Sequence, residues 1–169
     1  MMNLQQLIFL ISFSLPVSAL AANQIGDWVL NDGLEGVKIA NVTNSDGSTA
    51  GVICNTNSCD AYFTTSSNRA CDNGDKYPVL INSSVGAAAV NSVCREIGNI
   101  KIMQLTDTNA AISAFESGGD FGIALPLASG NFRSARFSTK GATQAIRWAS
   151  TPSPVSSKPF NNKSYDETF

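Results

Sequence analysis

The residues that could do acid–base or nucleophilic chemistry are limited, because the chain of 169 residues has no histidine. A Ser-His-Asp or Cys-His system needs an imidazole to accept the proton of the nucleophile. Zinc hydrolases with histidine ligands need imidazoles as well. The sequence excludes both classes and leaves a pair of carboxylates, as in glycosidases, as the remaining route to hydrolysis.

Carboxylates that could form such a pair occur along the region that we expect to fold. The candidates are Asp60, Asp72, Asp75, Glu96, Glu116 and Asp120. Only Asp72 and Asp75 are close in sequence, and Asp-Asn-Gly-Asp between strands is typical of a solvated turn. We therefore expect a protein that is not an enzyme, and a carboxylate-based hydrolase is the alternative.

Aromatic and basic side chains supply the candidate ligand contacts. Trp28 and Trp148 could stack on a ligand, although tryptophan in a small domain is more often part of the core. Arg133 and Arg136 could bind an anion, but residues three apart in a strand point to opposite faces of a sheet. The sequence thus favours a core role for the tryptophans and a surface role for the arginines. If the protein binds a ligand, Trp28, Arg133 and Arg136 are the candidate contacts.

No metal, cofactor or nucleic acid is expected. The turn at Asn44-Ser45-Asp46-Gly47 contains calcium-binding residue types, but an EF-hand loop opens with a carboxylate and ends with a glutamate, and both are missing here. The formal net charge is -2, and the 11 lysines and arginines are scattered along the chain. A nucleic-acid partner needs clustered positive charge to displace counterions from phosphates.

Four cysteines, Cys54, Cys59, Cys71 and Cys94, are the remaining reactive side chains. Four cysteines allow three pairings, and we favour Cys54–Cys59 and Cys71–Cys94. Residues 55–58 resemble a turn between two strands, which would bring Cys54 opposite Cys59. The spacing fits neither a structural zinc site nor a Cys-x-x-Cys redox pair. We expect structural disulfides, formed in an oxidising compartment.

The N-terminus predicts export. Residues 7–15 form an apolar run, Pro16 interrupts it, and Ala19-Leu20-Ala21 has the small-x-small pattern that signal peptidase accepts. We expect a signal peptide at residues 1–21, with cleavage after Ala21 or, alternatively, after Ala19, although its first six residues lack lysine and arginine. A membrane anchor is disfavoured because the run is too short for a bilayer core of about 30 Å. The mature protein is expected to be periplasmic or secreted, without stable membrane insertion.

Short strands joined by turns are expected to position these residues. Only 14% of the residues are charged, against about 25% in typical soluble domains. Alternation places Val37 and Ile39 on one face of a strand, and Pro78 predicts that its strand begins at or lies along a sheet edge. Residues 87–96 also fit a helix, but we favour a strand. The predicted strands are 27–30, 37–42, 52–54, 60–63, 77–81, 87–96, 100–105, 121–127 and 132–137.

Two short helices accompany the strands. The first, at 109–116, would be capped by Asp107 or Thr108. The second, at 142–149, would be capped by Ser138 or Thr139 and would place Ile146 against the sheet.

The domain organisation follows from these elements. Residues 22–150 are expected to form one β-rich domain, whose fold is mainly β: an antiparallel β-sandwich or curled sheet with two short helices, stapled by disulfides. Residues 151–169 contain three prolines and many polar residues. They predict a flexible C-terminal tail, because they offer too little apolar surface to offset the entropy of ordering.

The order of these features is similar to that of a known family. Asp27-Trp28 follows the predicted signal peptide, a cysteine-bearing β region comes next, and FGIALPL at 121–127 precedes GNFRSA at 130–135. In these motifs the chain resembles the invasion-associated locus B proteins over most of residues 27–149. It departs from the usual pattern by lacking a cysteine shortly after Trp28. The resemblance implies an exported bacterial β-rich protein with an envelope or host-cell role, and names no catalytic residue.

The sequence as a whole predicts an exported, non-enzymatic protein that acts by contacting another macromolecule, either a protein or an envelope component. A small ligand-binding module, an inhibitor of an envelope enzyme and a carboxylate-based hydrolase are the alternatives. Two carboxylates in one cleft, about 5–10 Å apart, would favour the hydrolase. An exposed apolar patch would favour a protein partner.

Overall fold

A computed structural model describes residues 23–65, 71–127 and 129–152. The predicted signal peptide and residues 153–169 of the predicted tail lie outside these described residues. The strands are β1 (Asn23–Ile25), β2 (Trp28–Asp32), β3 (Lys38–Thr43), β4 (Thr49–Cys54), β5 (Cys59–Thr64), β6 (Lys76–Ser83), β7 (Gly86–Ile97), β8 (Ile100–Leu105), β9 (Asp120–Pro126) and β10 (Phe132–Ser138). The helices are a 3-10 turn, η1 (Leu34–Gly36), and the α-helices α1 (Thr108–Phe115) and α2 (Ala142–Ser150).

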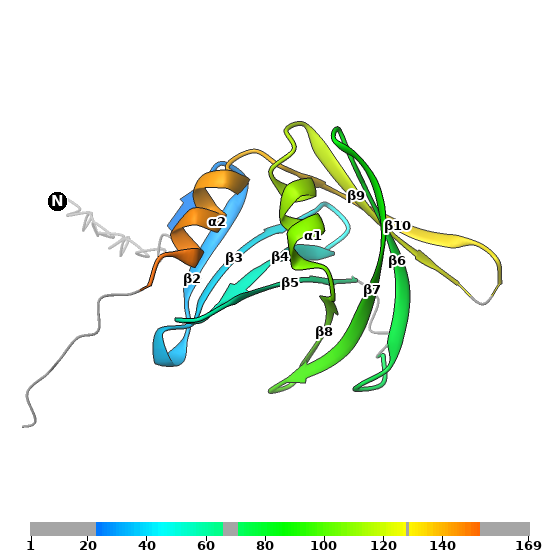
Figure 1. Cartoon of the computed structure of the whole chain (residues 1–169), viewed down its shortest axis with the longest axis horizontal. Helices are drawn as coiled ribbons and strands as arrows, with labels where there is room; N and C mark the ends of the chain where they lie inside the picture. The colour runs from blue at the N-terminus through cyan, green and yellow to red at the C-terminus, as the bar shows by residue number, and fades with distance from the viewer. Residues whose placement is uncertain (1–22, 66–70, 128, 153–169) are drawn as a thin grey trace, which may run out of the picture.

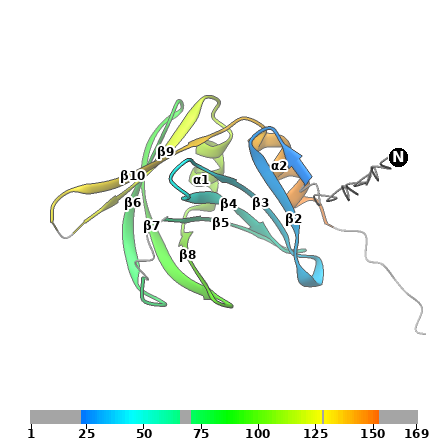
Figure 2. The same ribbon diagram turned by 180° about the vertical axis from the view of Figure 1, so that it is seen from behind.

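The described strands form a single antiparallel sheet, in the order β1-β2-β3-β4-β5-β8-β7-β6-β9-β10. Figures 1 and 2 show the sheet curled, with both α-helices inside the curl. Helix α2 packs on β2, β3 and β4, while α1 bridges β5 and β6 from the two sides of the curl. The predicted fold class, a mainly β protein with two helices, is confirmed as a curled sheet.

Alternating side chains of the strands point into the curl and make the core. In β3 the buried positions are Lys38, Ala40 and Val42. Val37 and Ile39 share the opposite face, as predicted, and are half-buried there. The inward face thus includes a lysine, whose tertiary contacts are described below.

An aromatic column joins the first strands of the sheet to the last. Ring centroids are 6.0 Å apart for Trp28 and Phe115, 4.6 Å for Phe115 and Phe121, and 5.1 Å for Phe121 and Phe137. All four side chains are buried. Burying such rings contributes about 1.5–3 kcal/mol each relative to leaving them exposed. The column therefore fastens β2, α1, β9 and β10 together.

Helix α1 begins as predicted, because the carboxylate of Asp107 accepts a hydrogen bond from the amide of Ala110 at 2.9 Å. The predicted caps of α2 are wrong. Its N-cap is Gly141 at φ 91°, and no side chain caps the helix. A Cβ at Gly141 would collide with the carbonyl oxygen of Ile25, so the close approach of the end of β1 excludes any capping side chain at this position. Ile146 is buried against the sheet, as predicted.

Strand β6 lies between β7 and β9, so the expectation of an edge strand is wrong for the strand as a whole. Its pairing with β7 covers all eight residues, but its pairing with β9 covers only Leu80 to Asn82. Pro78 lies before the part that β9 covers, so its missing N–H removes no bond to β9. Residues 87–96 are in a strand, as favoured, whereas β1 was not predicted because three residues are too few to show alternation.

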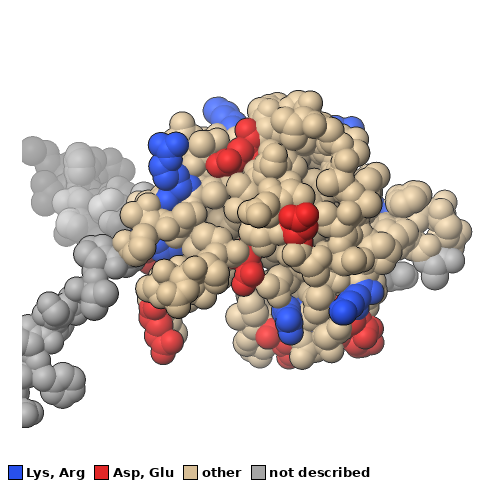
Figure 3. Space-filling model, viewed as in Figure 1, with Lys and Arg blue, Asp and Glu red and all other residues tan. Residues whose placement is uncertain are grey.

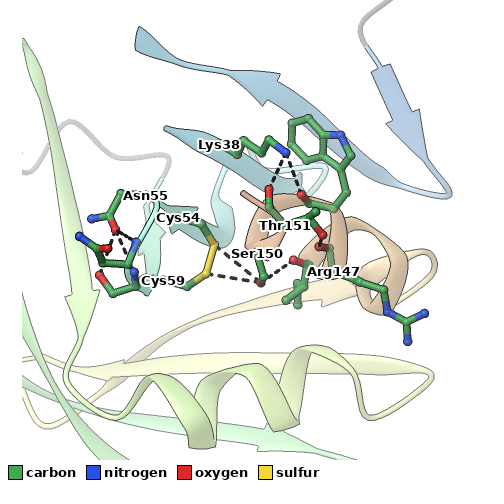
Figure 4. Close-up of a disulfide and its surroundings, with 11 residues drawn as sticks. Lys38, Cys54, Asn55, Cys59, Arg147, Ser150 and Thr151 are labelled. Carbon is green, nitrogen blue, oxygen red and sulfur yellow. Dashed lines mark hydrogen bonds between the residues drawn. A yellow bond between two sulfur atoms is a disulfide. The ribbon is translucent and has the colours of Figure 1, made fainter. Parts of the chain in front are cut away.

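Both predicted disulfides are confirmed. Cys54 and Cys59 face each other across the β4–β5 hairpin with a Cα–Cα distance of 4.0 Å, and Cys71 and Cys94 have a Cα–Cα distance of 5.9 Å. The side-chain oxygen of Asn55 accepts hydrogen bonds from the amides of the next turn residues, which fixes the hairpin (Figure 4). None of the described helices combines the length and the apolar character needed to span a bilayer.

Candidate functional site

The C-terminal half of β10 closes the curl against the first strands. The indole Nε1 of Trp28 donates to the carbonyl of Ser138 at 3.1 Å, and the side-chain amide of Asn44 donates to the carbonyl of Arg136 at 3.2 Å. The amide of Asp27 donates to the carbonyl of Lys140 at 2.9 Å just beyond the strand. We call this contact region, formed by Trp28, Asn44, Arg136 and Ser138, the seam.

The other half of β10 belongs to a projecting hairpin. Strand β9 pairs with β6 only at residues 122–124, so residues 125–126 pair with β10 alone. We call residues 125–127 and 129–133 the arm; Figure 1 shows it as the yellow hairpin that extends away from the body. Two of its apolar side chains are exposed, Phe132 at 65% and Leu127 at 38%. The arm therefore exposes apolar side chains at its tip, while Leu125 at its base packs against the core.

The backbone of β10 alternates between β9 and a free edge. Thr139 donates to Gly119, and Leu127 donates to Asn131, so the odd-numbered residues of β10 direct their N–H and C=O groups toward β9. The even-numbered residues direct theirs away from it, as the carbonyls of the seam confirm. Among the described residues, none hydrogen-bonds the outward N–H and C=O groups of Phe132 and Ser134. This end of β10 is an open sheet edge.

A groove of about 280 Å³ lies beside this open edge. Its floor is apolar and includes Phe63 and Ile123, each only 2% exposed. Polar side chains from the β3–β4 turn and the end of β5 form the wall opposite β10. The described lining residues are Asp46, Ser48, Phe63, Thr65, Ile123, Leu125, Arg133, Ser134 and Ala135. The groove thus lies between the open edge of β10 and the β3–β4 turn, which also carries Asn44 of the seam.

The candidate ligand contacts occupy three different surroundings. Trp28 is in the core, and its indole belongs to the seam. Arg133 lines the groove, whereas Arg136 is exposed on the other face of β10, as expected for residues three apart in a strand. Phe132 was not considered as a contact. Its spacing of five from the buried Phe137 signals the opposite face, so strand alternation could have indicated an exposed aromatic residue.

The candidate carboxylates lie on separate elements. Asp60, Glu96 and Asp120 are on β5, β7 and β9, and all are exposed. Asp72 and Asp75 are exposed in a turn, where the amide of Asp75 donates to the carbonyl of Asp72 at 3.0 Å. No group of three or more potential metal-ligating acidic or cysteine side chains occurs within the described ranges. Figure 3 likewise shows positive and negative residues scattered over the face in view.

A second polar cluster lies at the C-terminal end of α2 and serves the fold. The buried Lys38 amine donates to the carbonyls of Thr151 at 2.7 Å and Trp148 at 3.4 Å, and it lies 5.0 Å from the centre of the Trp148 ring (Figure 4). A cation is favourable at a helix C-terminus. The Ser150 hydroxyl donates to the carbonyl of Ile146 at 2.8 Å and lies 3.4 Å from the sulfur of Cys59. These groups satisfy one another, so the candidate site is the arm with its open edge and groove.

Comparisons with known proteins bear on the fold. No family model matches the chain, and no curated protein matches it. The crystal structure of invasion associated protein B from Bartonella henselae is similar, with a TM-score of 0.55 and 16% sequence identity, covering 76% of this chain and 94% of that chain. At this identity the likeness shows a shared fold. The resemblance inferred from the sequence motifs is confirmed at that level.

Proposed function

We propose that this chain is an exported, non-enzymatic binding protein that contacts a protein partner through the arm. The observation that carries the proposal is the exposed Phe132 on a hairpin that projects beyond the sheet. Exposed apolar surface next to polar surroundings marks interaction sites, and aromatic residues are enriched at protein interfaces. A binding role would use this side chain, which lies outside the buried core.

The disulfides support export. Disulfides persist in oxidising compartments, and the chain has two of them. The similar Bartonella protein is described as invasion associated, and we propose an envelope or host-directed role for this chain as well. Mass spectrometry of the native protein should then show an N-terminus at Ala22.

The groove supports a binding role over hydrolysis. Its described lining contains one carboxylate, Asp46, whereas a glycosidase-like mechanism needs two. An inhibitor of an envelope enzyme would use the same arm, with an enzyme as the partner. A small-ligand module is the second candidate function, because Arg133 beside an apolar floor suits a small amphipathic anion. The groove is near the lower limit of ligand pockets, about 300 Å³.

Site-specific photo-crosslinking tests the proposal. A benzophenone amino acid replaces Phe132 in the mature protein, and a matched variant carries it at Leu34 in η1, an apolar residue that is 89% exposed away from the arm. Oxidised samples are irradiated in the envelope fraction of the producing organism. We expect a discrete protein adduct at position 132, suppressed by excess unlabelled mature protein but not by its Phe132→Ser variant. Equal labelling at both positions, or equal suppression by both competitors, would contradict the proposal.

A further inference from the structure

We infer that the partner binds by adding an extended strand to the open edge of β10 at Phe132–Ser134. This inference rests on the proposed function, and it specifies how the arm binds. In strand addition, main-chain hydrogen bonds supply affinity, while pockets for alternate side chains supply specificity. The described residues offer both parts, an edge that none of them pairs and a groove beside it.

The edge has the pattern of N–H and C=O groups that an incoming strand requires. Phe132 and Ser134 each direct one donor and one acceptor away from β9, and no other described residue bonds them. This row of outward groups ends two residues later, because the side-chain amide of Asn44 donates a hydrogen bond to the carbonyl of Arg136. Native proteins usually cover or charge such edges. An added strand therefore has a short ladder with a defined end at the seam.

The groove accepts the side chains that such a strand directs into the curl. A strand beside β10 lies between β10 and the β3–β4 turn, so every second side chain faces the concave side of the sheet. The apolar floor of Phe63, Ile123 and Leu125 suits an aliphatic side chain there. The free volume of about 280 Å³ is larger than one such side chain. The added strand is thus expected to carry an aliphatic residue toward the groove.

The charges on β10 favour a strand from a different polypeptide over a strand from a second copy of this chain. The two charged residues of β10 are Arg133 and Arg136, one on each face, and Asp46 lies on the far wall of the groove. A symmetric antiparallel pair of β10 edges over Phe132–Ser134 would place Arg133 directly opposite its copy. Like charges in that position are destabilising. Because the aliphatic side chains point toward the groove, the alternate positions lie on the face of Arg136, where acidic residues are favoured. The partner segment is therefore extended, with alternating aliphatic and acidic residues.

Synthetic strand peptides test the pairing on the wild-type mature protein. The probe is a peptide of about ten residues with alternating glutamate and valine; a control has lysine in place of glutamate. Hydrogen exchange by NMR compares the amides of Phe132 and Ser134 with those of Arg133 and Ala135, which already face β9. We expect at least about tenfold slower exchange at Phe132 and Ser134 only, and binding at least about tenfold weaker for the lysine peptide. Unchanged exchange at saturating glutamate peptide, or no binding at millimolar concentration, overturns the inference.

Backbone methylation of the peptide adds a readout that a side-chain contact would not give. Two versions of the glutamate peptide carry N-methyl groups on alternate amides, in the two complementary sets. One set should abolish binding because it removes the donors that face β10, while the other set should bind nearly as well as the parent. Equal affinity of the two sets contradicts strand addition.

The Ser134→Pro variant separates this inference from the proposed function. Proline removes the outward N–H but leaves Phe132 exposed, and Ser134→Ala keeps that donor. With the crosslinker at position 132, we expect the adduct to fall at least about tenfold in Ser134→Pro and to persist in Ser134→Ala. If both variants label like the parent, the arm binds without strand addition. If the parent gives no specific adduct, the proposed function itself fails.

Two controls complete this test. A thermal melt checks that Ser134→Pro folds; if it does not, the peptide results decide. Dimerisation of the wild-type protein that Ser134→Pro abolishes would assign the edge to a second copy and overturn the inference.

Discussion

The two halves of β10 serve opposite purposes although they are consecutive in sequence. At the C-terminal half, Phe137 is 2% exposed and packs on Phe121, and the outward carbonyls are hydrogen-bonded by Trp28 and Asn44. At the N-terminal half, Phe132 is exposed and the outward groups lack partners among the described residues. The same strand is core at one end and available surface at the other. The difference shows that each half of β10 is buried only where the curled sheet places other side chains against it.

The glycines of the two regions show the same contrast. Next to the seam, Gly26 and Gly141 lie so close to the opposing backbone that a Cβ on either would collide with a carbonyl oxygen. In the arm, a Cβ at Gly130 would meet no atom within 4 Å. The opposing backbones are thus closely packed beside the seam, whereas the turn of the arm has open space around it.

The largest expected difference between the regions comes from their aromatic residues. Trp28→Ala should reduce the free energy of unfolding by about 3–5 kcal/mol, because it leaves a cavity in the core. Phe132→Ala should change it by less than about 0.5 kcal/mol, as is usual for surface positions. Denaturant unfolding followed by circular dichroism measures both, and Trp28→Phe serves as an intermediate control. Similar losses at the two positions would break the comparison.

The disulfides should differ in the same experiment. Replacing Cys71 and Cys94 by alanine should cost about 3 kcal/mol, against about 2 kcal/mol for Cys54 and Cys59, because the longer loop loses more entropy when it is closed in the unfolded chain. The sequence separations are 23 and 5 residues. Equal losses of stability would count against this account, as would peptide mapping that shows crossed pairs.

A pair of glycine substitutions sharpens the comparison further. Gly141→Ala combines a positive φ with the collision against Ile25, and we expect a loss of about 2 kcal/mol or more. Gly130→Ala, at φ 82°, carries only the cost of the backbone conformation, about 1 kcal/mol. Thermal melts of the two variants give the ranking. A larger loss at Gly130 would show that the arm, and not the seam, is the rigid region.

The smallest effect concerns Tyr62 and is confined to alkaline solution. Burial raises the pKa of the Tyr62 hydroxyl above its usual value of 10.0, although the hydrogen bond from Asn41 opposes that shift. A group that holds its proton more tightly in the folded state stabilises the fold below the pKa of the unfolded chain. This stability should be lost as pH rises above about 10, and Tyr62→Phe should remove that loss. Ultraviolet titration of tyrosinate, alongside unfolding at each pH, measures both; ionisation of Tyr62 at or below 10 would contradict the prediction.

Much of the local structure could be predicted from the residues. The Asn55 turn brings Cys54 opposite Cys59 through bonds within a few positions, so the hairpin and its disulfide follow from local chemistry. The start of α1 follows from Asp107 in the same way. The placement of Arg133 and Arg136 on opposite faces needs only the alternation of a strand. The groove beside Arg133 could not be predicted, since its opposite wall comes from the distant β3–β4 turn.

Lys38 shows what a pattern within a strand cannot indicate. Lysine is almost never fully buried unless it is paired. Lys38 is buried because its amine reaches the carbonyl of Thr151, 113 residues away, at the end of α2. No pattern within the strand contains that information.

By itself the sequence indicated most of the strands, the turns, both α-helices and the Cys54–Cys59 hairpin, since these depend on neighbours along the chain, and it favoured Cys71–Cys94 among the possible pairings. Only the tertiary structure decided the order of strands, the burial of Lys38 and the division of β10 into seam and arm. The physical reason is distance along the chain: the bond from Trp28 to Ser138 spans 110 residues, and such contacts form only when the whole sheet curls. Beside Phe132 and Ser134 the curl brings no partner from the described residues, and there the edge is open.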